Sequence, residues 1–159
     1  MKILVAYFSA SGVTAKVAKK LAEVTGAQLY DIVPAVIYNT ADLDWRNPKS
    51  RSSVEMNDKN CRPKLLDRGA PVAGADVVFV GYPVWWYREP SIIDSFLEAY
   101  DFTGKKIVPF VTSGGSEIGE EAPKRIAEIS GAEVLPGKRF DPGVSKDVLK
   151  AWAESILGG

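Results

Sequence analysis

Near its amino terminus the chain reads Ile3-Leu4-Val5-Ala6-Tyr7-Phe8-Ser9-Ala10-Ser11-Gly12. The first six of these residues are continuously apolar, as in a strand buried on both faces, and a turn of small polar residues follows at once. Beyond the turn, Val17, Leu21 and Val24 recur at helical spacing until Gly26. This opening therefore predicts a buried strand followed by a helix.

The rest of the chain repeats this alternation. Further strands are predicted over 28–33, 76–81 and 106–112, with a short fifth strand at 133–136. Helices are predicted over 91–100 and 117–130. A last helix with Ser145 as its N-cap is predicted from Val144, Val148, Trp152 and Ile156, which recur every four residues. Alternating strands and helices imply parallel pairing through right-handed crossovers. We expect an α/β protein with a three-layer, doubly wound, five-stranded parallel sheet.

Residues 38–72 do not fit this alternation. The chain has 159 residues, which fits one domain covering 1–159, and this segment is then a long irregular insertion within it. Only 52–58 has a pattern compatible with a turn or two of helix. Segments of this length without regular structure are commonly functional, for example as lids.

The composition excludes several kinds of chemistry. There is no histidine and only one cysteine, Cys61, so histidine-dependent catalysis, histidine metal sites, disulfides within the chain and thiolate clusters are excluded. Demanding chemistry would then require a bound cofactor. The formal net charge is 0, and no apolar run is long enough for a membrane span. We expect a cytoplasmic protein that binds neither nucleic acid nor membrane.

The turn after the first strand, Ser9-Ala10-Ser11-Gly12-Val13-Thr14-Ala15, leads into a helix. Free backbone N–H groups and the positive helix end meet there, and three hydroxyls lie beside them, so the turn suits a phosphate. The alternative is that these residues only cap the helix.

Aromatic residues follow the strand at 76–81, in Tyr82-Pro83-Val84-Trp85-Trp86-Tyr87. Two tryptophans and a tyrosine at a strand end cannot all point into the core, so at least one ring is predicted to meet a planar ligand. Neighbouring residues of an extended chain point in opposite directions, and we favour Trp85 as the stacking ring by its place after Pro83-Val84. The alternative is that the rings fill a gap or a subunit contact.

A third small-residue turn, Thr112-Ser113-Gly114-Gly115-Ser116, follows the strand at 106–112. Its glycines let the backbone approach a flat ligand closely. The alternative is an ordinary glycine-rich turn that binds no ligand. Gly114 and Gly119 have the spacing of a P-loop, but Glu120 and Glu121 stand where Lys and Ser/Thr are required. Hydrolysis of ATP or GTP is therefore not expected.

Taken together, these motifs resemble the flavodoxin family. The resemblance runs over most of the chain and includes 3–25, 42–45, 50–52, 81–86 and 109–116. It implies the strand order 2-1-3-4-5 and non-covalent FMN as the cofactor. It implies that the phosphate lies on Ser9, Ser11, Gly12, Val13, Thr14 and Ala15. The flavin ring is implied to lie between Pro83, Val84, Trp85, Trp86 and Tyr87 on one side and Thr112, Ser113, Gly114, Gly115 and Ser116 on the other.

The resemblance implies electron transfer to an unidentified redox protein or small acceptor. Two features depart from the family pattern: Val13 replaces the usual Asn, and the net charge is 0 where many electron carriers are acidic. The alternative is an NAD(P)H-dependent FMN or quinone reductase on the same fold, with 38–72 in its substrate pocket. A phospho-receiver domain is disfavoured because clustered acids are missing after Tyr7-Phe8.

No catalytic side chain or metal site is expected. Cys61 lies beside Arg62, which could lower its pKa, but solitary cysteines are mostly inert. Asp42, Asp44 and Glu55 lack the spacing of a calcium loop, and Glu120 and Glu121 suit the first turn of a helix.

Overall fold

The computed structural model describes residues 1–113 and 117–158. Its strands are β1 (Ile3–Tyr7), β2 (Gln28–Asp31), β3 (Val77–Pro83), β4 (Lys106–Thr112), β5 (Glu133–Val134) and β6 (Lys138–Arg139). All of their pairings are parallel, and the order is β2-β1-β3-β4-β5. The predicted fold class and strand order are confirmed.

The fifth position of the sheet is divided between two short strands. β5 and β6 both pair with β4, where 133–136 was predicted to form one strand. Ile107 and Val111 of β4 accept hydrogen bonds from this outer segment, so Pro109 between them faces it too. Because Pro109 has no N–H to donate, the ladder is interrupted at this point.

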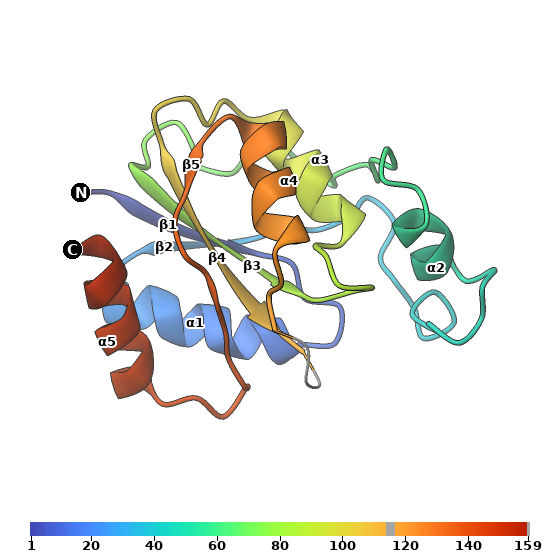
Figure 1. Cartoon of the computed structure of the whole chain (residues 1–159), viewed down its shortest axis with the longest axis horizontal. Helices are drawn as coiled ribbons and strands as arrows, with labels where there is room; N and C mark the ends of the chain where they lie inside the picture. Colours follow the sequence, from blue (N-terminus) through green and yellow to red (C-terminus); the bar gives the residue numbers. More distant parts are fainter. Residues whose placement is uncertain (114–116, 159) are drawn as a thin grey trace.

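Helices cover both faces of the sheet (Figure 1). They are α1 (Val13–Thr25), α2 (Arg51–Met56), α3 (Ser91–Ala99), α4 (Glu121–Ser130) and α5 (Lys146–Leu157). α1 and α5 pack together on one face, and α3 and α4 pack together on the other. α2 lies apart, beyond the carboxyl ends of the strands, within the predicted irregular segment (Figure 1).

The core is divided by the sheet into two layers. In β1, Leu4 and Ala6 face the α3–α4 layer, whereas Val5 and Tyr7 face the α1–α5 layer. All four side chains are buried, which explains why this strand is continuously apolar rather than alternating. In the part of the chain that the structure describes, no helix is long and apolar enough to cross a membrane.

Two predicted boundaries differ from the structure for reasons that the backbone shows. β2 ends at Asp31 rather than at Val33, because the chain then turns away and Pro34 pairs with Leu65. α4 begins at Glu121 rather than at 117, because Gly119 has a φ of 73°, which does not fit a right-handed helix.

The buried face of α5 differs in part from the prediction. Val144, Trp152 and Ile156 pack against the core, but Leu149 and Ala153 are the buried residues of the helix and Val148 is 48% exposed. Residues four apart advance by about 40° beyond a full turn of a helix with 3.6 residues per turn. A row spaced by four therefore drifts off the core face. The predicted N-cap is confirmed, because the Ser145 side chain accepts a hydrogen bond from the Val148 N–H.

Candidate functional site

The loop between β1 and α1 leads into the N-terminus of α1, and the Ser9 hydroxyl holds its backbone in shape. Ser9 Oγ accepts hydrogen bonds from the backbone N–H groups of Gly12 (3.0 Å) and Ala15 (3.2 Å). Gly12 has a φ of 90°, a left-handed conformation that glycine adopts without strain, and α1 starts at the next residue, Val13. Ser11 is exposed, and the first turn of α1 has no acidic residue. The loop therefore presents backbone N–H groups and a helix end without a repelling carboxylate.

Thr14, which the resemblance implies is near the phosphate, makes a side-chain contact with β4. Its side chain is buried, and its hydroxyl lies 2.8 Å from that of Thr112 at the end of β4. This hydrogen bond joins the first residues of α1 to the neighbouring strand end. The Thr14 hydroxyl is thus already paired within the protein, and a phosphate on this loop would meet Ser11 and the backbone.

The aromatic residues after β3 form a two-residue hairpin turn. The backbones of Trp85 and Arg88 exchange two hydrogen bonds of 3.1 Å, and between them Trp86 (φ 46°) and Tyr87 (φ 66°) are both left-handed. Turns of this kind normally carry Asn or Gly, because in this conformation the Cβ atom of other residues lies too close to the following carbonyl oxygen. Such backbone strain costs about 1–3 kcal/mol per residue and clusters at functional sites.

The two tryptophans have different surroundings. Trp85 packs edge to face against Phe8 (centroids 5.6 Å apart) and Tyr38 (5.4 Å), so it is attached to the core. Trp86 is 37% exposed and Tyr87 is 78% exposed. The hairpin therefore consists of one anchored ring and two rings that solvent reaches.

The strand ends of β3 and β4 are joined beneath this hairpin. Pro83 is the last residue of β3, and the N–H of the next residue, Val84, donates to the carbonyl of Thr112 (3.0 Å). Ser113 is held from the outer edge, because Arg139 of β6 donates to both its hydroxyl and its carbonyl (3.0 Å each). Of the predicted ring-binding residues, Gly114, Gly115 and Ser116 lie outside the described residues.

A pocket of about 380 Å³ lies between the hairpin and the segment around α2. The described residues that line it are Leu43, Trp45, Ser52, Val84, Trp85, Trp86 and Tyr87. All of them are uncharged, and four are aromatic. Its volume lies within the usual range for small-molecule sites, and its walls suit a flat, largely apolar ring.

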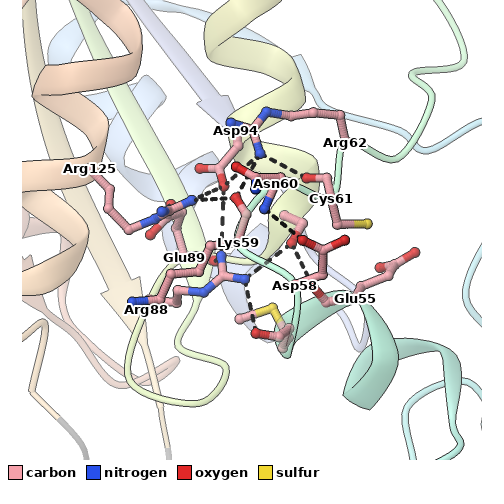
Figure 2. A network of polar contacts seen from close by, with 12 residues as sticks. Glu55, Asp58, Lys59, Asn60, Cys61, Arg62, Arg88, Glu89, Asp94 and Arg125 are labelled. Carbon is pink, nitrogen blue, oxygen red and sulfur yellow. Dashed lines mark hydrogen bonds and ion pairs between the residues drawn. The ribbon is translucent and has the colours of Figure 1, made fainter.

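Behind the hairpin lies a buried network of charged residues, shown in Figure 2. Arg88, Glu89 and Asp94 are at most 2% exposed, and Arg125 of α4 donates to Glu89 (3.0 Å) and Asp94 (2.6 Å). Among the described residues, Glu89 Oε1, Asp94 Oδ1 and the Tyr82 hydroxyl have no hydrogen-bond partner. Burial, reinforced by the nearby Asp94 carboxyl, raises the pKa of Glu89 to about 9. Glu89 is therefore protonated at neutral pH.

Neither this network nor the contact of Arg139 with Ser113 was predicted from the sequence. Two signals for the network were present: the charged pair Arg88-Glu89 directly follows the aromatic run, and Asp94 lies among the apolar residues of the predicted helix 91–100. Neither signal identifies the partners, because Arg125 lies 31 residues from Asp94 along the chain.

The remaining candidates, Cys61 and the acidic residues, are accounted for by burial, ion pairs and a helix terminus. Burial, with smaller contributions from Glu55 and Asp58, raises the pKa of Cys61, so Arg62 does not activate it. Arg51 lies 3.0 Å from Glu55 and 3.9 Å from Asp42. Glu121 is in the first turn of α4 and pairs with Lys59, whereas Glu120 is the residue before the helix. No cluster suited to a metal ion occurs within 1–113 and 117–158.

The fold and the loops at its carboxyl edge define a doubly wound α/β protein with a candidate mononucleotide site. A family model described as flavodoxin matches residues 2–156, so this chain belongs to the flavodoxin family. The comparison with curated proteins gives no match.

Solved structures agree with this assignment. A candidate flavoprotein from Bacteroides eggerthii DSM 20697 is 44% identical, with 98% of each chain covered and a TM-score of 0.91. A second one, from Bacteroides uniformis ATCC 8492, is 43% identical over 96% of this chain and 97% of that chain, with a TM-score of 0.90. A flavoprotein from Lactobacillus acidophilus NCFM, solved in complex with FMN, is 23% identical over 87% of this chain and 92% of that chain (TM-score 0.69) and shares the fold.

Proposed function

We propose that this chain binds FMN non-covalently and serves in electron transfer. The observation that carries this proposal is that the helix N-terminus at Gly12 and the uncharged aromatic pocket lie at the same edge of the sheet. In parallel sheets of this kind, ligands bind beyond the carboxyl ends of the strands. The flavodoxin family and the FMN complex of the Lactobacillus acidophilus relative support this choice of ligand.

Each part of the site would have a distinct task. Backbone N–H groups of residues 11, 13 and 14 and the Ser11 hydroxyl would hold the phosphate, while Ser9 Oγ keeps the loop in shape by accepting from Gly12 and Ala15. The hairpin 85–88 would cover the ring, and residues 112–116 would approach it from the β4 side. When bound, the flavin supplies the one- and two-electron redox chemistry, and the protein supplies position and electrostatics.

The phosphate part is tested by a charge placed in the loop. In Ser11→Glu, a carboxylate would repel a phosphate but affect a ligand without one much less. We expect the Kd for FMN, measured by flavin fluorescence, to rise at least tenfold, since hydrogen bonds to charged groups contribute about 1.5–3 kcal/mol each. Riboflavin is the matched control ligand and should lose little. A wild-type protein that causes no flavin absorbance change during FMN titration would contradict the proposal outright.

The ring part is tested by the two tryptophans. We expect Trp85→Ala or Trp86→Ala to weaken FMN binding, since stacking contributes about 0.5–1.5 kcal/mol beyond area burial. Trp85→Ala also removes the ring between Phe8 and Tyr38, so its urea midpoint must be measured in parallel. Equal and negligible losses of affinity would mean that neither ring stacks on the flavin.

A second function, an NAD(P)H-dependent FMN or quinone reductase, is favoured by one observation. Leu43, Trp45 and Ser52 bring the long segment 38–72 to the wall of the aromatic pocket, where it could enclose a flat acceptor. Steady-state oxidation of NADPH by the FMN-loaded protein with a quinone acceptor separates the two functions. A carrier should need a separate reductase, whereas a reductase should turn over alone.

A further inference from the structure

The Trp85–Arg88 hairpin is held in an unfavourable backbone shape, so something must stabilise it. Its two central residues are left-handed, and their side chains are the exposed rings of the candidate flavin site. The strained residues themselves are at the surface, whereas Arg88, which closes the hairpin, is only 2% exposed. The support therefore has to come from the base of the turn rather than from its tip.

We propose that Arg88 is a positioning residue for the flavin site, whose buried guanidinium fixes the aromatic hairpin and joins it to the end of α2. This inference rests on the proposed binding of FMN. Arg88 itself would not contact the flavin, because it is not among the residues that line the pocket and its guanidinium points into the charged network (Figure 2).

The guanidinium of Arg88 reaches three elements at once. Nη2 donates to the carbonyl of Met56, the last residue of α2 (3.1 Å), and lies 3.4 Å from the hydroxyl of Ser91, the first residue of α3. Nη1 donates to the Glu89 carbonyl (3.0 Å) and lies 3.6 Å from Asp94 Oδ2. Only a planar fork with several donors can satisfy these directions together, and the single ammonium of lysine cannot.

The same network also fixes the segment that forms the other wall of the pocket. The Ser91 hydroxyl donates to the Glu55 carbonyl (3.3 Å), and Arg62 and Arg125 both donate to the Lys59 carbonyl (3.0 and 3.2 Å). Residues 55–62 are thereby attached to α3 and α4, as Figure 2 shows. Since this segment continues from the one that carries Leu43, Trp45 and Ser52, Arg88 links the two walls of the pocket.

The alternative explanation is that Arg88 only balances the negative charge of the buried Asp94 and does not position the hairpin. Asp94 is fully buried, and Arg88 and Arg125 are two of the cations around it, with Arg62 at 3.7 Å. Removing Arg88 would then destabilise the protein simply by leaving a buried carboxylate short of cations. The experiment must distinguish a loss of geometry from a loss of charge balance.

The variants are Arg88→Met, Arg88→Lys and the double variant Arg88→Met/Asp94→Asn. Leu149→Ala is the matched control, because it removes core packing from α5 on the opposite face and leaves the hairpin untouched. Three measurements are made: the urea midpoint, the Kd for FMN, and the rate at which chymotrypsin cleaves the FMN-free protein after Trp86 or Tyr87, located by mass spectrometry.

We expect Arg88→Met to be cleaved at the hairpin at least tenfold faster and to bind FMN at least tenfold more weakly. The double variant should recover part of the urea midpoint, but its hairpin should still be cleaved rapidly and its FMN binding should stay weak. The hairpin of Arg88→Lys should also be cleaved faster than that of the wild type. Leu149→Ala should lower the midpoint without faster cleavage at the hairpin. If Arg88→Met does not fold, the Lys and double variants carry the same test.

Two results would overturn the inference: full hairpin protection in Arg88→Met, or recovery of protection and affinity by Arg88→Lys or by the double variant. The first result would mean that the hairpin needs no support from the Arg88 side chain, and the second that charge balance is enough. If the wild-type protein binds no FMN, the proposed function fails. Cleavage of the FMN-free variants still decides whether Arg88 holds the hairpin, so the two failures are distinguishable.

Discussion

Thr14 and Thr112 connect two parts of the candidate site through one hydrogen bond. Thr14 is the second residue of α1, beside the proposed phosphate loop, and Thr112 ends β4 beside the proposed ring loop. Both side chains are buried, and their hydroxyls are 2.8 Å apart. A buried hydroxyl that loses its partner is costly, whereas removing both hydroxyls costs little.

We therefore predict that Thr14→Val and Thr112→Val each lower the free energy of unfolding by about 1–3 kcal/mol. The double variant should lose clearly less than the sum of the two, because no hydroxyl is left unpaired in it. Urea denaturation of the four proteins in a double-mutant cycle measures this coupling. Thr103→Val is the exposed control, and strictly additive losses would show that the pair does not interact.

The element that closes the chain, α5, depends on its cap and on its contact with α1. Ser145 caps its N-terminus through Val148, and Lys20 of α1 donates to the carbonyls of Pro142 and Val144 just before it (3.0 and 2.8 Å). The cap was predictable from the sequence, because it needs only a hydroxyl before a run of helical spacing. The link to Lys20 was not, because it joins residues more than 120 positions apart.

We predict that Ser145→Ala lowers the free energy of unfolding by about 1 kcal/mol, since the Val148 N–H loses its acceptor. Ser155→Ala is the matched control: Ser155 lies inside the same helix, is exposed, and donates only to the carbonyl three residues earlier. Thermal or urea unfolding of both variants gives the comparison. Equal stability of the two variants would show that the cap does not stabilise α5.

At the scale of the whole molecule, patterns local in sequence predicted the sheet and the three loops at its edge. Apolar runs, helical spacing and small-residue turns are short-range signals. They predicted the strands and helices directly, and the strand order followed from the family resemblance that these motifs carry. The buried network was not predictable, because Glu89, Asp94 and Arg125 come from three elements that only the folded chain brings together. The left-handed hairpin was not predictable for a related reason: Trp86-Tyr87 contradicts the local preference of such turns, and the flanking Trp85 and Arg88 contact residues far away in the sequence.

The network makes the stability of the whole molecule depend on pH. Glu89 faces Asp94 of α3, Tyr82 of β3, Arg125 of α4 and the adjacent Arg88. Its pKa is raised from 4.5 to about 9 in the folded protein, so between these values the folded chain keeps a proton that the unfolded chain has lost. The stabilisation from this proton is complete below about pH 4.5 and disappears as pH rises through about 9.

We predict that the free energy of unfolding of the wild-type protein falls between pH 5 and pH 9 relative to that of Glu89→Gln. The difference in slope is at most about 1.4 kcal/mol per pH unit, the value for one proton. Glutamine imitates the protonated acid and can still accept from Arg125. Urea unfolding at several pH values measures the slopes, with Glu98→Gln as the exposed control. Parallel curves for the wild type and Glu89→Gln would contradict a raised pKa.

The divided outer strand has a consequence for solubility at high concentration. A long, regular edge strand offers a row of unpaired N–H and carbonyl groups on which another chain can build a sheet. Here β5 and β6 have two residues each, separated by a segment that contains Pro136, and the exposed Lys138 lies at this border. The opposite edge, β2, has only four residues and ends at Asp31. Both borders of the sheet are thus poor templates for fibre growth, which protects a chain that buries so many β-branched residues in its central strands.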